Sequence, residues 1–367
     1  MKKATFLTFS IIGALTVYAP AQAETYAPKC FAPLNASTKT INFPAKKGPY
    51  KIGFANGFIG NGWRVQMLQT LRAYAETPEM KPQIKELRIV SVGTDVSAQI
   101  ASMDNFINAG MDAIIVDANS PTAFKPVLRR AQQAGVLIVS FDNIFDGAEK
   151  YNNLIQVNQD QYAIGKLSAE WLLHNMKEKN KILEVRGVPG NSVDRDRHQG
   201  FRDALKEGGN PQVVEVVGNW DDGAGQKAVA DALAVNGSFD GIYTQGGSIG
   251  VTHGLLDSHK PLVPIAGEGE NGFRKLIAAH SKEGLLGESI GQSPALVAVS
   301  LKAAVAALQG KPLPQEIRVP LPEANYKTLE PGKNYFPDLT DTFFAARDFP
   351  VCDISLSAES IIGQPSK

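Results

Sequence analysis

The feature that most constrains the fold is an alternation of short apolar strands with amphipathic helices, which fills most of the chain and restarts near residue 154. Between the strands, apolar side chains recur at helical spacing, as at Met67, Leu68 and Leu71. Nearly continuous apolar strands separated by helices are typical of a parallel sheet with helices on both faces. We expect strands over 51–56, 87–92, 113–117, 137–142, 154–158, 181–186, 212–218, 241–245, 263–266 and 285–290.

The repeated layout predicts an α/β chain of two lobes, each a mostly parallel sheet, with a cleft between them. The chain should cross between the lobes near 158–159, 291–292 and 320–322, and three crossings permit a hinge while they restrain twisting. We assign a signal peptide over 1–23 and an N-terminal extension over 24–48. The N-terminal lobe covers 49–158 and is completed by about 293–321. The C-terminal lobe covers 159–292, with part of 322–352 as a candidate to complete it, and 353–367 form a C-terminal tail.

The first residues have the pattern of an export signal. Lys2 and Lys3 precede an apolar run over 6–19, which is too short to span a bilayer. Ala21-Gln22-Ala23 then matches a signal-peptidase site. We therefore expect cleavage after Ala23 and a soluble, exported protein.

Composition restricts the cofactors and partners. The chain has 37 basic and 37 acidic residues and no basic run, so nucleic acid is not an expected partner. Its five histidines form no pair at helical spacing and have no cysteine neighbours, so we expect neither a metal nor another cofactor. Cys30 and Cys352 lie near opposite ends, and in an oxidising compartment a disulfide between them is favoured over two buried thiols.

The stretch over 185–201 holds the sharpest binding candidate. An apolar strand and a Gly- and Pro-containing turn lead to Ser192, a good helix N-cap. Arg195 then lies in the first turn, where the helix dipole disfavours a cation, so we expect it to grip a polar ligand. Arg197 should face away. The alternative is that both arginines pair with neighbouring aspartates on a solvated face.

Planar polar groups and tryptophans collect after the expected strands, where open α/β sheets bind ligands. Carboxylates, amides and guanidinium groups pair with adjacent hydroxyls, and tryptophan faces pack on the C–H faces of sugar rings. Turns and helix caps explain some of these residues, but they explain the tryptophans and Arg64 poorly. The candidate ligand-binding residues are Asn56, Asn61, Trp63, Arg64, Asp117, Asp142, Asn143, Arg195, Trp220, Gly246, Glu268 and Gln292.

Several of these segments resemble type I periplasmic binding proteins, the ribose- and galactose-binding group that serves ABC sugar importers. Asn61-Gly62-Trp63-Arg64 resembles the entry to the first helix of that family, and Val139-Ser140-Phe141-Asp142 the strand whose aspartate grips ring hydroxyls. The segment over 192–201 is similar to the S-x-x-R-x-R-x-x-G-F pattern, whose first arginine, here Arg195, contacts sugar. The likeness covers about 50–322.

The resemblance also implies that Trp220 stacks on the sugar and that Gln292 is a cleft glutamine. Three departures affect the site: Gly246-Gly247 stands where Asn-Asp is common, Asn143 where Arg is common, and Glu268 where Asp is usual. The cleft should therefore be roomier on one side, and the usual ligands of the family cannot be assumed.

The resemblance implies a monomeric, non-enzymatic protein that captures a small sugar, as a pentose, a hexose or a furanose form, and delivers it to an ABC permease. A polyol or a furanose-like signal molecule is the alternative ligand, and a chemoreceptor is a further candidate partner. An enzyme reading rests on Gly246-Gly247-Ser248-Ile249-Gly250, which matches the G-x-S-x-G pattern of serine hydrolases. No oxyanion segment of that class is evident, so the binding reading is favoured.

Overall fold

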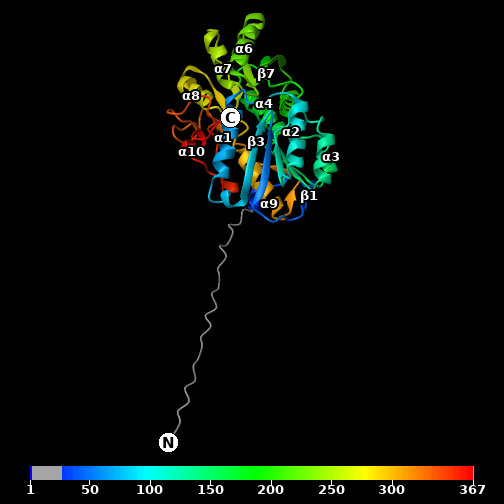
Figure 1. Cartoon of the computed structure of the whole chain (residues 1–367). Helices are drawn as coiled ribbons and strands as arrows, with labels where there is room; N and C mark the ends of the chain where they lie inside the picture. The colour runs from blue at the N-terminus through cyan, green and yellow to red at the C-terminus, as the bar shows by residue number, and fades with distance from the viewer. Residues whose placement is uncertain (2–26, 367) are drawn as a thin grey trace.

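The computed structural model describes Met1 and residues 27–366. Apart from Met1, the expected signal peptide over 1–23 and its cleavage site after Ala23 lie outside the described residues. Figure 1 shows two lobes, one mainly blue and cyan and the other mainly green and yellow, and each is built on a six-stranded sheet. None of the helices in the described part of the chain has the length and apolar character that crossing a membrane requires.

The sheet of the first lobe is parallel throughout. One face is covered by α1 (Gly62–Ala75) and α9 (Leu296–Leu308), and the other by α2 (Val96–Asn108) and α3 (Lys125–Gln133). Its central strands are buried on both sides, which explains their continuous apolar sequences. The strand order is β13 (Glu316–Arg318), β6 (Leu154–Asn158), β5 (Leu137–Phe141), β4 (Ala113–Val116), β2 (Tyr50–Asn56) and β3 (Ile84–Ser91).

The sheet of the second lobe is parallel except at one edge, where β14 runs antiparallel to β11. Its order is β14 (Glu323–Asn325), β11 (Gly287–Ile290), β10 (Ile265–Gly267), β9 (Gly241–Thr244), β7 (Lys181–Arg186) and β8 (Gln212–Val217). One face carries α4 (Gln161–Asn175) and α5 (Ser192–Glu207), and the other α6 (Asp222–Asn236), α7 (Ser248–Asp257) and α8 (Asn271–His280). The expected architecture of two mostly parallel, helix-covered sheets is confirmed.

The described chain passes between the two sheets three times. It leaves the first sheet after β6, returns after β11 through α9 and β13, and leaves again to form β14. Late segments therefore add an edge strand to each sheet. The passages fall at 159–160, 291–295 and 319–322.

Both ends of the described chain are fastened to the first lobe. β1 (Thr40–Ile41) pairs with β12 (Leu313–Pro314), and α10 (Ala358–Ile362) packs on α1. The predicted disulfide is confirmed: Cys30 in the short helix η1 (Pro28–Cys30) is bonded to Cys352 in η5 (Pro350–Cys352), with a Cα–Cα distance of 4.4 Å.

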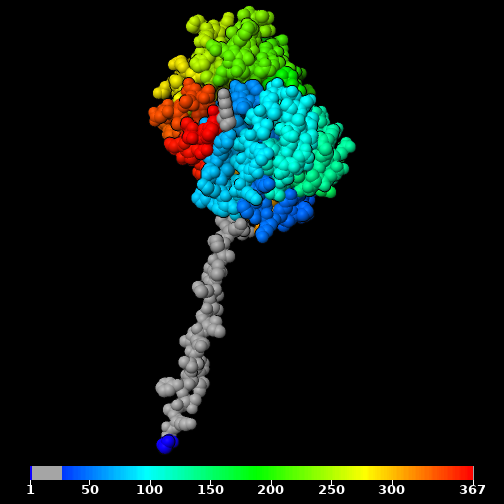
Figure 2. Space-filling model, viewed as in Figure 1, coloured from blue at the N-terminus to red at the C-terminus, as the bar shows by residue number. Residues whose placement is uncertain are grey.

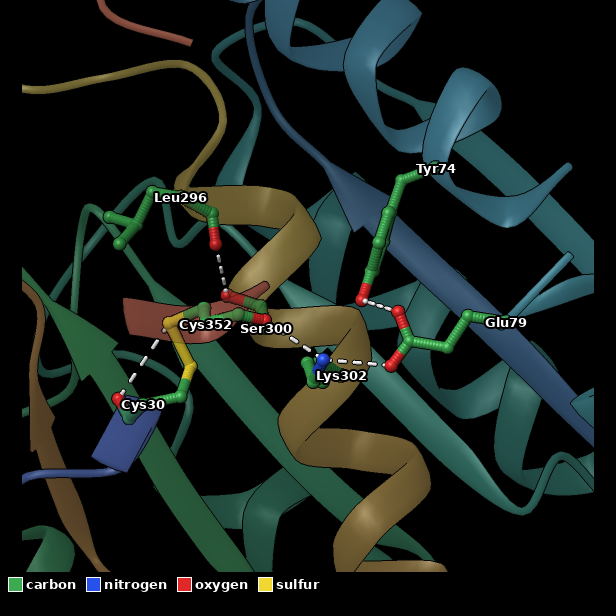
Figure 3. The surroundings of a disulfide bond; sticks show 7 residues. All are labelled: Cys30, Tyr74, Glu79, Leu296, Ser300, Lys302 and Cys352. Atoms are coloured by element: carbon green, nitrogen blue, oxygen red, sulfur yellow. Dashed lines mark hydrogen bonds and ion pairs between the residues drawn. A yellow bond between two sulfur atoms is a disulfide. The ribbon is translucent and has the colours of Figure 1, made fainter. Parts of the chain in front are cut away.

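The buried side chain of Lys302 connects the disulfide to the core of the first lobe. Lys302 lies in α9, which is buried along its whole length, and its Nζ donates to the carbonyl of Cys352 at 2.8 Å. The same Nζ lies 2.7 Å from the carboxylate of Glu79, which also accepts a hydrogen bond from the Tyr74 hydroxyl (Figure 3). A buried ammonium is costly unless it is paired, so moving the C-terminal segment away would leave Lys302 without one of its partners. These contacts therefore hold the segment against the first lobe.

Candidate ligand-binding site

A cavity of about 340 Å³ lies between the two lobes. Each lobe contributes polar and aromatic side chains to the lining, which consists of Asn61, Trp63, Arg64 and Asp142 from the first lobe and Val193, Arg197, Trp220, Glu268 and Gln292 from the second.

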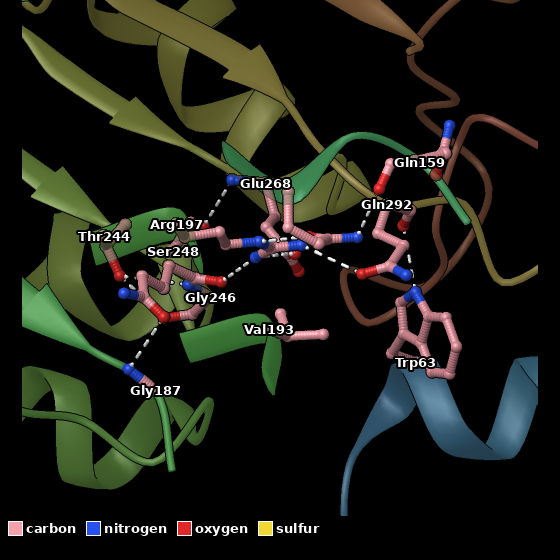
Figure 4. Close-up of polar contacts among 12 residues, drawn as sticks. Trp63, Gln159, Gly187, Val193, Arg197, Thr244, Gly246, Ser248, Glu268 and Gln292 are labelled. Carbon is pink, nitrogen blue, oxygen red and sulfur yellow. Dashed lines mark hydrogen bonds and ion pairs between the residues drawn. The ribbon is translucent and has the colours of Figure 1, made fainter. Parts of the chain in front are cut away.

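The start of α1 positions the first group of lining residues. Asn61 is the N-cap, and its side-chain oxygen accepts a hydrogen bond from the backbone N–H of Arg64 at 3.0 Å. This cap places Trp63 and Arg64 in the first turn, beside the cavity. The Trp63 indole N–H donates to the carbonyl of Gln292 at 2.9 Å, so the ring reaches from the first lobe to the crossing after β11 (Figure 4).

Two carboxylates hold the guanidinium of Arg64. It is hydrogen-bonded to Asp117 and lies 3.3 Å from the carboxylate of Asp142, which lines the cavity. Burial raises the pKa of Asp117, and burial together with the charge of Asp117 raises the pKa of Asp142 well above its usual range. Asn143 donates to both carboxylates at 2.8 Å. Asp117 and Asn143 therefore lie behind the lining and orient the two groups that face the cavity.

Arg197 organises the second lobe's side of the cavity. It is 1% exposed and lies on α5, with its Nη1 2.6 Å from the carboxylate of Glu268 and its Nη2 3.1 Å from the side-chain oxygen of Gln292. It also donates to the carbonyl of Gln245 and to the side chain of Gln161. Burial raises the pKa of Glu268, and the Arg197 charge opposes that shift. Figure 4 shows Arg197, Glu268 and Gln292 side by side.

Two glycines make room for Trp220. Trp220 follows β8 in the left-handed backbone region, at φ 56°, and its ring lies against Gly187 and Gly246. A Cβ on Gly187 would lie 2.2 Å from the indole, and one on Gly246 would lie 2.9 Å from it. None of the described residues accepts a hydrogen bond from the buried Trp220 N–H. Gly246, expected to contact ligand, instead lies behind the indole that lines the cavity.

The structure reverses the roles that were predicted for the two arginines of α5: Arg197 lines the cavity, and Arg195 does not. Arg195 is half exposed and lies outside the lining, where it pairs with Asp196 at 2.7 Å and with Asp146 of the first lobe at 3.3 Å. The prediction that Arg197 faces away is wrong. Residues two apart on a helix point about 200° apart, so only one of the two can face the cavity. The helix is capped by Asn191, one residue before the predicted cap Ser192.

Of the predicted residues, seven line the cavity together, and five do not. Asn56 is buried at the end of β2, where its amide donates to the hydroxyl of Ser91 at 3.0 Å. The others outside the lining are Asp117, Asn143, Arg195 and Gly246. Sequence reasoning missed Val193 and Arg197. The sequence pattern that could have identified them is the i, i+4 spacing of Val193, Arg197 and Phe201, which lie on the buried face of α5.

Ser248 does not have the surroundings of a nucleophile. It is buried at the start of α7, and its hydroxyl accepts a hydrogen bond from the backbone N–H of Glu268 at 2.9 Å. Its own carbonyl accepts from Thr252. A serine nucleophile needs a base within hydrogen-bond reach, and these contacts give the hydroxyl a structural role instead.

One group of side chains has the composition of a metal site. Glu184, His198 and Glu215 place one ligand atom each within 4.8 Å of one another. However, Arg186 lies 2.8 Å from the carboxylate of Glu215, and Arg202 lies 3.9 Å from that of Glu184. Because these guanidinium groups already compensate the carboxylates, we interpret the group as an ion-pair network.

Comparison with known proteins agrees with this geometry. Residues 52–312 match the model of the periplasmic binding protein domain. The chain belongs to the periplasmic binding protein family. Membership confirms the expectation of a solute-binding protein rather than an enzyme, and it implies export to the periplasm.

Among curated relatives, the ribose import binding protein of Bacillus subtilis (strain 168) is 23% identical over 325 residues, 88% of this chain and 98% of that protein. The galactofuranose-binding protein of Escherichia coli (strain K12) is 26% identical over 182 residues, 49% of this chain and 56% of that protein. The D-ribose/D-allose-binding protein of Pseudomonas aeruginosa is 31% identical over 48% of this chain and 55% of that protein. The match therefore spans about half the length of the last two relatives.

Solved structures share the fold. A galactofuranose binding protein superposes with a TM-score of 0.67 at 20% identity, covering 76% of this chain and 96% of that one. The periplasmic binding protein of the arabinose ABC transporter from Shewanella sp. ANA-3 superposes with a TM-score of 0.65 at 22% identity, covering 76% and 92%. The family match ends at residue 312, so the C-terminal segment that contacts both lobes lies outside it.

Proposed function

We propose that the protein captures a small sugar in the cavity between its lobes and presents it to an ABC import permease. The observation that carries this proposal is the lining itself, in which two indoles and two braced guanidinium groups come from opposite lobes. Carboxylate, amide and guanidinium groups suit adjacent hydroxyls, and the faces of Trp63 and Trp220 suit the C–H surface of a sugar ring. Relatives that bind ribose, allose and galactofuranose support the same ligand class.

The internal hydrogen bonds of Arg197 limit what it gives to the ligand. A guanidinium has five N–H donors, and four of those on Arg197 are used within the protein. Arg197 therefore offers one donor to a sugar hydroxyl, while it fixes the acceptors Glu268 and Gln292. The site is preorganised, because its polar groups are held in place by one another before the ligand arrives.

Closure of the lobes is the proposed signal to the permease. Gln159 connects the three crossings: it donates to the carbonyl of Pro320 at 2.6 Å and accepts from the N–H of Ser293 at 2.9 Å. The contact between Arg195 and Asp146 spans the rim of the cleft. This exposed ion pair contributes at most about 1 kcal/mol, and a ligand that contacts both lobes adds to the stability of the closed form by its differential affinity.

The remaining expectations complete the proposal. The protein acts as a monomer after cleavage following Ala23, with the permease as its membrane partner and a chemoreceptor as a further partner. A polyol or a furanose-like signal molecule is the competing ligand class. One relative is a xylitol-binding protein, 24% identical over 60% of this chain, and for this reason the experiment below includes polyols.

A thermal-shift screen of the mature protein tests the proposal. The panel contains ribose, allose, arabinose, galactose and fructose, with xylitol and glycerol as polyols and leucine as an unrelated solute. We expect at least one sugar to raise the melting temperature, and calorimetry to give one site per chain. A shift with xylitol alone would transfer the assignment to polyols. Stabilisation by leucine and by no sugar would contradict the proposal.

A further inference from the structure

A second chamber of about 630 Å³ adjoins the cavity. The two share Asn61, Trp63, Trp220 and Glu268 as lining, so they meet at the pair of indoles. A ligand held between these rings can therefore extend into the second space. The residues that line only the chamber include Asp221, Asp222, Ile249, Glu270, Thr342 and Phe344.

The outer wall of the chamber comes from the C-terminal segment, beyond the family match. We call residues 336–346 the strap. In Figure 2 the orange and red C-terminal residues lie against both lobes. Thr342 and Phe344 of the strap face the chamber. A Cβ on Gly62 would lie 2.7 Å from the carbonyl of Thr342, so the strap approaches the start of α1 as closely as a glycine permits.

The strap is held in one position by both lobes. On the first lobe, the side chain of Gln66 donates to the carbonyl of Phe344 at 3.0 Å and accepts from its N–H at 2.7 Å. On the second lobe, the side-chain oxygen of Asn271 accepts from the N–H of Phe336 at 2.7 Å, and the N–H of Asn271 donates to the carbonyl of Phe343 at 2.7 Å. These paired bonds make the wall a fixed surface.

The charge of the chamber selects among ligands. Among the described residues that line the chamber there is no lysine or arginine, whereas four of them carry a carboxyl group. Glu270 accepts hydrogen bonds from the backbone N–H groups of Gly247, Ser248 and Ile249 at the start of α7. None of the described residues donates to Oδ2 of Asp221 or Asp222, although Oδ1 of each accepts a backbone bond. Arg197 compensates Glu268, and the pKa of Glu270 is raised to about 8, so Asp221 and Asp222 supply the negative charge of the chamber. The chamber therefore offers acceptors for hydroxyl groups and disfavours anions.

We propose that this chamber is a second subsite, which holds a neutral polyhydroxylated group joined to the sugar in the cavity. The preferred ligand is then a disaccharide or another glycoside rather than a free monosaccharide. The indoles at the junction supply faces for both rings, and Phe344 supplies an apolar surface at the far side. This inference rests on the proposed function, since it needs a sugar in the first cavity.

The test compares sugars of two sizes. The probes for calorimetric titration are galactose, arabinose and ribose, the disaccharides lactose, melibiose and arabinobiose, and galactosyl phosphate as an anionic glycoside. We expect at least one disaccharide to bind about tenfold or more tightly than its constituent monosaccharide, and galactosyl phosphate to bind more weakly than galactose. Monosaccharides that bind more tightly than every disaccharide would overturn the subsite and leave the proposed function intact.

A matched pair of strap variants locates the effect. Thr342→Trp places a large side chain in the chamber, and Thr340→Trp places the same side chain two residues away, at an exposed position outside the lining. Thr342→Trp should lower the disaccharide affinity about tenfold and leave the monosaccharide affinity within about twofold, whereas Thr340→Trp should change neither. Equal losses for both sizes, or no loss with Thr342→Trp, would overturn the subsite. Binding of no sugar by the parent protein would overturn the proposed function as well.

Discussion

Arg197 carries more of the site than any other side chain. It is buried, it compensates Glu268, and it orients Gln292 beside the indole of Trp63. Its donors lie in the fixed fork of a guanidinium, which a lysine cannot reproduce because an ammonium is a single point on a flexible stem. The residue is therefore better described as a support for the binding surface than as a simple ligand contact.

The first prediction compares the two arginines of α5. Arg197→Lys should lower sugar affinity about ten- to hundredfold, because it loses charge-assisted hydrogen bonds worth roughly 1.5–3 kcal/mol and releases Glu268 and Gln292. Arg195→Ala should bind within about twofold of the parent. Calorimetry measures both, and melting curves show whether each variant is folded. The reverse order of losses would contradict the assignment of Arg197 to the cavity.

At the residue scale, the sequence predicted the classes of side chain in the site better than their orientation. Residues directly after strands, such as Asp142 and Glu268, were found because every parallel strand ends at the same edge of its sheet. Arg195 was predicted to bind the ligand, and Arg197 was not, because the helix-dipole argument considers only how far along the helix a residue lies. Which side chain points inward depends on rotation about the helix axis, and the buried neighbours Val193 and Phe201 reveal it.

The elements themselves were predictable where they are buried on both faces. β7 was expected over 181–186 and is found there, and β10 was expected over 263–266 and is found at Ile265–Gly267. The course of the strap was not predictable. Its contacts join residues far apart in sequence, as between Asn271 and Phe336, and its backbone bonds leave no periodic pattern in the sequence.

The second prediction concerns the disulfide that fastens the C-terminal segment. The chain-entropy model assigns about 5–6 kcal/mol to a loop as long as that between Cys30 and Cys352, and measured values are often lower. The double variant Cys30→Ser/Cys352→Ser should therefore unfold at a clearly lower urea concentration than the oxidised parent. Parent protein unfolded under reducing conditions is the control and should behave like the variant. An unchanged midpoint would contradict the structural role of the bond.

The third prediction is a pH dependence at the edge of the second sheet. Burial, and then the neighbouring Glu323 of β14, raise the pKa of Glu288 on β11 to about 8. Between about 4.5 and 8 the native state holds a proton that the unfolded chain has lost, so the free energy of unfolding falls as pH rises through this window. Glu288→Gln, which is neutral at every pH, should reduce the drop in melting temperature between pH 5 and pH 8.5.

The exposed substitution Glu207→Gln is the control for this pH effect, and its pH profile should follow the parent. Burial, and then Asp222 and Glu268, also raise the pKa of Glu270 to about 8, so part of the drop should persist in Glu288→Gln. A profile for Glu288→Gln identical to that of the parent would show that Glu288 does not hold the proton.

At the scale of the whole molecule, several hydrogen bonds and ion pairs among the described residues join the two lobes. They include the hydrogen bond from Trp63 to Gln292, the rim pair of Arg195 and Asp146, and the strap, which binds Gln66 on one lobe and Asn271 on the other. Opening about the three crossings must release some of these contacts, and the strap must move with one lobe. A ligand that contacts both lobes at once stabilises the closed form by its differential affinity.

A crystal structure of the protein with the tightest-binding sugar of the panel tests the central claim most directly. We predict one sugar ring between Trp63 and Trp220, with hydroxyl groups within hydrogen-bond distance of Arg64, Asp142 and Arg197, and with both lobes in contact with the same ring. A sugar bound to one lobe alone, or at any place outside this cavity, would contradict the account.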